Sequence, residues 1–183
     1  MNTKSHKAIR MLCEGALMIA LAEILSFLPL YKMAWGGSID LAMLPIFVFC
    51  VRWGFGPGLL VSFAHALLQT LFEGGIAIGW QSILGDFLIA YTVLGLAGIF
   101  NNFYLGTLLG CAARFLVHYV VGATIWAAYM PDVFFGMTMT SPWFYSALYN
   151  GFYMVIDCAL ILVIGFLLKK TPAKVYLQRY DGE

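Results

Sequence analysis

Polar side chains at helical spacing form a candidate binding face between Arg114 and Trp126. Arg114 and His118 are four residues apart, and Gly122 and Trp126 continue the same spacing, so the four residues share one face of a helix. At a rise of about 1.5 Å per residue, Arg114 lies about 18 Å from Trp126 along the helix axis. The face therefore presents an aromatic ring, an imidazole and a guanidinium in that order, which is typical of a pocket that opens at the Trp126 end.

Further polar groups are expected at a similar depth in neighbouring segments. Asp86 falls level with His118, and Tyr145, Ser146 and Asn150 fall in the outer half of the last apolar segment. Aromatic walls with a carboxylate suit a flat, cationic molecule, whose charge Asp86 could neutralise. His118, Tyr145, Ser146 and Asn150 would then bind its donors and acceptors. Hydrogen bonds between helices would use the same residue types, so the pattern leaves both roles open.

Other polar groups in the apolar segments have a structural interpretation. Arg114 and Asp157 fall at comparable depth, and intramembrane charges tend to pair, which predicts a structural ion pair. His65 and Gln69, one turn apart, predict an interhelical contact. Trp35 and Trp126 lie near the outer interface, where an aromatic belt is the default interpretation.

Several kinds of chemistry have no support in the sequence. It contains no G-x-x-x-x-G-K-[ST] motif for ATP and no metal-ligand cluster at useful spacing, so we expect neither a metal nor a cofactor. Ser146, His118 and Asp86 could be written as a hydrolytic triad. Ser146, however, lies on an ordinary helical stretch without the strained turn of a nucleophile elbow, so we expect no enzyme.

The elements that position these groups must be membrane helices. Of the 183 residues, 62% are hydrophobic and 10% are charged, against about 25% charged in ordinary soluble domains. We predict one all-α membrane domain, residues 1–183, since crossing a bilayer takes about 20 apolar residues per helix. Its six transmembrane helices are expected at about 8–30, 39–53, 56–73, 79–100, 104–128 and 142–168. The second and third form a tight hairpin around residues 54–58.

Basic residues indicate the orientation of the bundle. Eight of the ten Lys and Arg residues would lie on one side of a six-helix bundle: Lys4, Lys7, Arg10, Arg52, Lys169, Lys170, Lys174 and Arg179. Because cytoplasmic loops are enriched in Lys and Arg, both termini are predicted to be cytoplasmic.

Three stretches resemble one transporter family. Tyr145 followed by SALYNGFYM (146–154) is similar to the signature of the thiamine-specific S components of energy-coupling factor (ECF) transporters, the ThiT-like membrane proteins of Gram-positive bacteria. The segment RFLVHYVVGATIW (114–126) resembles the family's basic-x-x-x-His-x-x-x-Gly segment. DFLIAYTVLGLAGIF (86–100) resembles its fourth helix.

The resemblance implies a ligand and the residues that bind it. In that family a carboxylate, a histidine, a tyrosine and an asparagine at these places hold thiamine, and tryptophans stack on its rings. Carried onto this chain, the resemblance implicates the following residues: Asp86, His118, Trp126, Tyr145 and Asn150, with Trp35 as the first-loop tryptophan and Ser146 beside them.

The resemblance also implies partners. Ala16 and Ala20 are small residues four apart, a spacing that lets helices approach closely, either within the bundle or with another protein. In the resembling family an A-x-x-x-A here meets the transmembrane coupling subunit, which brings two ATPases. We therefore expect a thiamine-binding subunit of an ATP-driven importer in the cell membrane, with no nucleic-acid partner.

Two alternatives remain open at the level of sequence. The first is an S component for another heteroaromatic vitamin or precursor, such as hydroxymethylpyrimidine. The second is a solitary proton-coupled carrier that uses Asp86, His118 and Arg114 as a relay.

Overall fold

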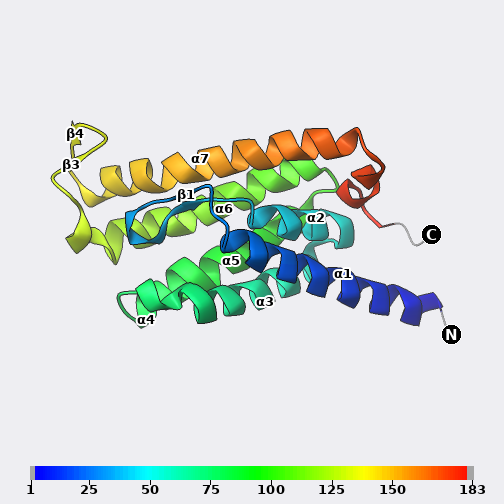
Figure 1. Ribbon diagram of the computed structural model, residues 1–183. Coiled ribbons are helices and arrows are strands. Elements are labelled where there is room, and N and C mark those ends of the chain that lie inside the picture. Colours follow the sequence, from blue (N-terminus) through cyan, green and yellow to red (C-terminus); the bar gives the residue numbers. More distant parts are fainter. Residues whose placement is uncertain (1–2, 181–183) are drawn as a thin grey trace.

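The computed structural model describes residues 3–180, and its regular structure is almost entirely helical (Figure 1). The longer elements are α1 (Thr3–Ser26), α2 (Met43–Trp53), α3 (Phe55–Glu73), α6 (Phe103–Thr124) and α7 (Pro142–Lys169). A composite rod between α3 and α6 consists of α4 (Trp80–Ser82), η3 (Ile83–Ile89), α5 (Ala90–Thr92) and η4 (Val93–Ile99). These six rods begin and end within five residues of the ranges expected from the sequence.

Four of the rods are long and apolar enough to cross a membrane: Phe55–Ile76, Trp80–Ile99, Phe103–Thr124 and Pro142–Lys169. The helix α2 has only 11 residues, and most of its side chains are buried within the bundle, with Met43, Ile46 and Phe47 fully enclosed. The helix α1 has 24 residues but carries charged side chains along its length. The protein is thus an almost entirely helical, multi-pass membrane bundle, and a count of six crossings stays a prediction.

The composite rod departs from the plain helix expected at 79–100. Its η3 segment is π-helical and contains Asp86, and η4 is a 3-10 helix. Wide π turns are rare and often occur at functional sites, because they change the direction in which the following side chains point. The local winding at Asp86 is therefore a property that the apolar pattern of the sequence did not indicate.

The turn between α2 and α3 is shorter than the expected turn at 54–58. Gly54 alone separates the two helices, and its φ of 91° lies in the left-handed region that favours glycine. Pro57 falls in the first turn of α3, where a missing backbone N–H leaves no helical hydrogen bond unmade. The predicted tight hairpin therefore forms with a single connecting residue.

Two small β-hairpins occur in the loops opposite the termini. The strands β1 (Tyr31–Lys32) and β2 (Ser38–Ile39) pair antiparallel around η1 (Ala34–Gly36). The strands β3 (Val133–Phe134) and β4 (Met137–Thr138) pair in the same way and extend beyond the start of α7 (Figure 1). Three further 3-10 helices are η2 (Gly74–Ile76), η5 (Ala127–Tyr129) and η6 (Pro172–Leu177).

The two ends of the described chain lie at the same end of the bundle, opposite β3 and β4 (Figure 1). This agrees with the expectation that both termini share one side of the membrane, and the assignment of that side to the cytoplasm remains a prediction. We call the two ends of the bundle inner and outer on that basis.

The inner end is held together by the carboxylate of Glu14. Its oxygens accept hydrogen bonds from Nε of Arg10 at 2.9 Å, Nε of Arg52 at 2.7 Å and Nε1 of Trp53 at 2.7 Å. Arg52 also donates to the carbonyl of Val175 at 2.8 Å, and its guanidinium lies over the ring of Tyr180. One carboxylate thus ties α1 to α2 and, through Arg52, to the C-terminal segment.

We expect Glu14→Gln to lower the stability of the bundle. Arg52 is 4% exposed, and the substitution leaves its charge without a counter-ion. The loss should be about 2 kcal/mol, below the roughly 3–5 kcal/mol of a fully buried pair, because the Glu14 side chain is 14% exposed. This loss of stability is measured by thermal unfolding of the protein in detergent. As a control, Arg10→Gln removes a partner that is 45% exposed and screened by water, so it should lower the unfolding temperature much less. Equal losses in both variants would contradict this account.

Candidate functional site

A cavity lies near the outer end of the bundle, where α3, η3, α6 and α7 meet the β1–β2 hairpin. The space between the lining atoms, including the open mouth, amounts to about 810 Å³. Aromatic side chains and a few polar groups share the lining. This combination is the ordinary composition of a site for a small organic ligand.

Most of the residues that the sequence singled out for binding line this cavity. Six of the seven contribute to it: Asp86, His118, Trp126, Tyr145, Ser146 and Asn150. The seventh, Trp35, belongs to η1, and its side chain lies outside the described part of the structure.

The helix α6 presents its predicted face to the cavity. Arg114, His118, Gly122 and Trp126 all contribute to the lining, with Trp126 just beyond the last residue of the helix. Arg114 is 8% exposed and His118 is 9% exposed. The spacing of four residues thus placed these groups on one side of the helix, as the sequence indicated.

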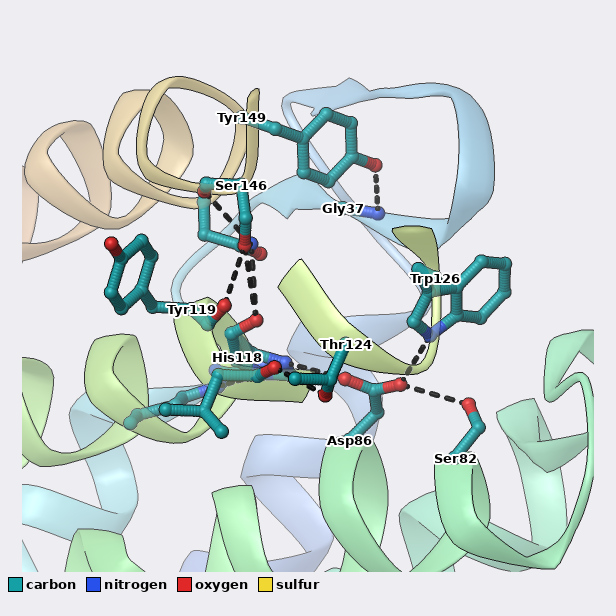
Figure 2. Close-up of polar contacts among 12 residues, drawn as sticks. Gly37, Ser82, Asp86, His118, Tyr119, Thr124, Trp126, Ser146 and Tyr149 are labelled. Atoms are coloured by element: carbon teal, nitrogen blue, oxygen red, sulfur yellow. Dashed lines mark hydrogen bonds and ion pairs between the residues drawn. The ribbon is translucent and has the colours of Figure 1, made fainter. Parts of the chain in front are cut away.

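The carboxylate of Asp86 accepts three hydrogen bonds from three directions. Nδ1 of His118 lies 3.1 Å from Oδ1, and Nε1 of Trp126 donates to Oδ2 at 2.7 Å. The hydroxyl of Ser82 donates to the same oxygen at 2.8 Å. Figure 2 shows the indole and the hydroxyl pointing at the carboxylate from separate elements. Asp86 therefore joins η3 to α6 and fixes the orientation of the Trp126 ring over the cavity.

Arg114 continues this network away from Asp86. Its Nε donates to Nε2 of His118 at 3.3 Å, so Nε2 acts as an acceptor and the proton of the neutral imidazole resides on Nδ1, facing Asp86. The guanidinium also lies 4.2 Å from the centroid of the Tyr91 ring. A cation, a neutral imidazole and a carboxylate are thereby connected in one line along the cavity wall.

The predicted direct ion pair between Arg114 and Asp157 is wrong. Both side chains are buried, but within residues 3–180 no ion pair of 4.0 Å or less joins them. Oδ1 of Asp157 instead accepts the backbone N–H of Asp40 at 3.0 Å. The carboxylate of Asp157 thus bonds to the backbone just after β2. Its role is to attach the first outer hairpin to α7.

Ser146 and Asn150 connect α7 to α6. The hydroxyl of Ser146 donates to the carbonyl of Tyr119 at 2.8 Å (Figure 2). Nδ2 of Asn150 donates to the carbonyl of His118 at 3.2 Å. The hydroxyl of Tyr153 donates to Oδ1 of Asn150 at 2.9 Å. Both residues therefore form hydrogen bonds between the helices and also line the cavity. The sequence left an interhelical role and a binding role open, and their positions are compatible with both.

Three tyrosines of α7 form the aromatic side of the cavity: Tyr145, Tyr149 and Tyr153. The hydroxyl of Tyr149 accepts the backbone N–H of Gly37 at 3.0 Å and contacts the carbonyl of Ala34, which holds the β1–β2 hairpin against α7 (Figure 2). The hydroxyl of Tyr145 makes no hydrogen bond to any described residue. Tyr145 is thus the member of the three whose hydroxyl is available to a ligand.

The sequence missed several lining residues. Tyr91, Glu73 and the hairpin residues Gly37 and Ser38 were not selected as candidates, and they all line the cavity. Glu73 was assigned to the end of a helix beside a loop, where a charge needs no special explanation. The contribution of the hairpin depends on how the first loop folds back over the bundle, which no local pattern indicates.

A second buried polar cluster lies between α1 and α3. Glu23 bonds Nδ1 of His65 at 2.7 Å and accepts from Nε2 of Gln69 at 2.9 Å. This confirms the predicted interhelical contact of His65 and Gln69. The His65 ring packs edge-on against Tyr91, with 5.2 Å between centroids, so this cluster supports the cavity wall from behind.

Two further expectations concern the rest of the described chain. Ala16 and Ala20 are exposed on α1, so they do not serve as contacts within the bundle. Within residues 3–180, no group of three or more His, Cys, Asp or Glu side chains is arranged to hold a metal ion.

Comparisons with known proteins identify a family. The sequence model of the family described as Thiamine transporter protein (Thia_YuaJ) matches residues 12–177. Thiamine transporter ThiT of Lacticaseibacillus paracasei is 26% identical over 193 residues, covering 92% of this chain and 92% of the relative. Thiamine transporter ThiT of Bacillus subtilis is 28% identical over 186 residues, covering 90% of this chain and 93% of the relative.

A solved structure supports the fold. ThiT from Listeria monocytogenes superposes with a TM-score of 0.81 at 24% identity, covering 93% of this chain and 98% of that chain. At 24% identity, this likeness shows that the two chains share a helical architecture.

We expect Gly122→Ala to disturb the contact between α6 and α7. A Cβ atom at Gly122 would lie 2.4 Å from Oγ of Ser146, which is 1% exposed and cannot move aside freely. Overpacking of this kind should cost about 1–3 kcal/mol, measured as a lower unfolding temperature in detergent. The matched control is Gly151→Ala, whose Cβ would meet Phe115 at 3.7 Å. That substitution should be neutral or stabilising by up to about 1 kcal/mol. Identical unfolding temperatures for the two variants would refute the prediction.

Proposed function

The chain belongs to the thiamine transporter protein family, and from this premise we propose that it is the thiamine-binding subunit, or S component, of an ATP-driven ECF importer. It captures thiamine from outside and releases it to the cytoplasm together with a coupling module. No bond of the substrate changes, so the protein is a transporter subunit and not an enzyme. Its relatives come from Gram-positive bacteria, and we assign it to the cell membrane of such an organism.

The observation that carries the ligand assignment is the composition of the outer cavity. Thiamine joins an aminopyrimidine, rich in donors and acceptors, to a cationic thiazolium ring. The cavity offers a carboxylate at Asp86, the free hydroxyl of Tyr145 and aromatic rings that attract cations. His118 and Asn150 supply further polar contacts beside Trp126. The number and kind of these groups match one flat, cationic molecule.

Individual roles can be assigned from the contacts already present. Trp126 stacks on a ring of thiamine in an orientation that its bond to Asp86 fixes. His118 and Asn150 face the ligand while their other contacts hold α6 to α7. Ser146 supports Asn150, to which it is bonded at 3.0 Å. Trp35 is proposed as a second stacking residue from the family resemblance.

The energy source is supplied by partners. The family resemblance implies that two ATPase subunits hydrolyse ATP and act through a transmembrane coupling subunit, and the sequence itself has no P-loop. The exposure of Ala16 and Ala20 supports a contact of α1 with that subunit, because small exposed residues four apart allow close helix approach.

One alternative has a specific observation in its favour. The connected groups Arg114, His118 and Asp86 could relay a proton and make the chain a solitary carrier. Uptake by liposomes that contain this chain alone, driven by a pH gradient, would support that alternative.

The other alternative, an S component for a pyrimidine precursor, predicts that hydroxymethylpyrimidine alone competes as well as thiamine does.

We expect the purified protein to bind thiamine with quenching of tryptophan fluorescence, and Asp86→Asn to weaken binding by well over tenfold. The amide keeps the shape but removes the charge and cannot accept from both Trp126 and His118. Loss of one partner of a buried charged group costs about 3–5 kcal/mol. As a control, Ser82→Ala removes one donor and keeps the charge, so its loss should stay below about tenfold. An unchanged affinity in Asp86→Asn would show that Asp86 is structural.

The proposed contact surface on α1 gives a separate prediction. The double substitution Ala16→Leu and Ala20→Leu should leave thiamine affinity unchanged and reduce ATP-driven uptake several-fold when the chain is reconstituted with its coupling module. Ala112→Leu, at an exposed alanine of α6, is the matched control and should leave uptake intact. Normal uptake by the double variant would exclude this surface as the docking site.

A further inference from the structure

The cavity contains a second carboxylate besides Asp86. Glu73 is the last residue of α3 and contributes to the cavity lining. Its side chain is 21% exposed, so it is neither fully hydrated nor sealed in the bundle. Neither the family resemblance nor the relatives' names give this residue a role.

Asp86 has little capacity left for an additional charged partner. A carboxylate has about four acceptor positions, and Asp86 already fills three of them with His118, Trp126 and Ser82. Its negative charge is also opposed by the guanidinium of Arg114, which reaches it through His118. Asp86 is therefore better placed to orient the wall and accept one neutral donor than to balance a ligand's positive charge.

Glu73 differs from Asp86 on each of these points. Its carboxylate makes no hydrogen bond to any described residue, and its ion-pair partner is Lys32, at 3.8 Å. That distance is too long for a hydrogen bond, and the Lys32 side chain is 60% exposed. A pair of this kind contributes about 0–1 kcal/mol, because water screens it and holding a long exposed side chain in place costs conformational entropy. A cation in the cavity could replace Lys32 at small cost.

We propose that Glu73 is the counter-ion of the ligand's cationic ring and thereby determines selectivity for a charged ligand. The inference rests on the proposed function. Lys32 is the internal cation that the ligand displaces, and it moves into solvent when the thiazolium ring approaches Glu73. Asp86 meanwhile binds the neutral, hydrogen-bonding half of the molecule. The two carboxylates of the lining thus serve the two chemically different halves of thiamine.

The test compares two ligands that differ only in charge. Thiamine and its neutral thiophene isostere, in which the ring nitrogen of the thiazolium is replaced by carbon, are titrated by calorimetry into the wild-type protein, Glu73→Gln and Lys32→Gln. Glu73→Gln should weaken thiamine binding roughly tenfold, because it removes a partly desolvated charge, and change isostere binding less than about twofold. Lys32→Gln should tighten thiamine binding about threefold, since the competing cation is gone.

The controls separate this inference from the proposed function. Asp86→Asn should weaken both ligands, and retained isostere binding by Glu73→Gln shows that this variant is folded. If Glu73→Gln binds thiamine like the wild type, or loses both ligands equally, Glu73 is not the counter-ion. An unchanged thiamine affinity in Lys32→Gln would overturn the displacement of Lys32. Failure of the wild-type protein to bind thiamine would overturn the proposed function and this inference with it.

Discussion

The carboxylate of Asp86 is the constraint on which the architecture of the outer half depends. A charge inside a membrane bundle is costly unless the protein supplies its hydrogen-bond partners. Here the partners come from α4, from α6 and from Trp126 just beyond the end of α6. The hydrogen bonds to Asp86 therefore fix the composite rod against α6 and set the direction of the Trp126 ring. The π-helical winding of η3 is part of the same arrangement, because it determines where Asp86 points.

Polar contacts hold both ends of the bundle together, but the two ends differ in whether a cavity remains between the helices. At the inner end, the carboxylate of Glu14 gathers Arg52 and Trp53, and the C-terminal segment closes over them. At the outer end, Asp157 and Tyr149 attach the β1–β2 hairpin to α7 without filling the space beneath it. Polar contacts hold the backbone at both ends, and the outer end in addition keeps a cavity. This difference is consistent with a subunit that receives its ligand at one end only.

The sequence predicted the relations that helix geometry determines and missed those that depend on how helices rotate and loops fold. Spacing by four residues placed His118 and Trp126 on one face, because that relation is internal to a helix. Arg114 and Asp157 were matched by depth alone, and depth says nothing of which direction each helix turns its side chains. Trp126 was expected to stack, but its indole N–H also bonds Asp86, a contact between elements 40 residues apart. Glu73 was not selected as a candidate, because a charge at the end of a helix has no apparent free-energy cost of burial.

The arrangement of charges in the cavity bears on how a tight site could still release its ligand. Arg114 offsets Asp86 through His118, and Lys32 offsets Glu73 across 3.8 Å. If a cationic ligand replaces Lys32, one positive charge leaves the carboxylate as another arrives, so the Coulombic contribution of Glu73 to affinity is limited to roughly tenfold. Affinity then depends mainly on the aromatic enclosure and on the hydrogen bonds to the neutral ring. Such contacts require close packing and are lost when the walls separate. A modest separation of α6, α7 and the hairpin would therefore weaken binding steeply, while Lys32 again neutralises Glu73 and no unpaired charge is left behind.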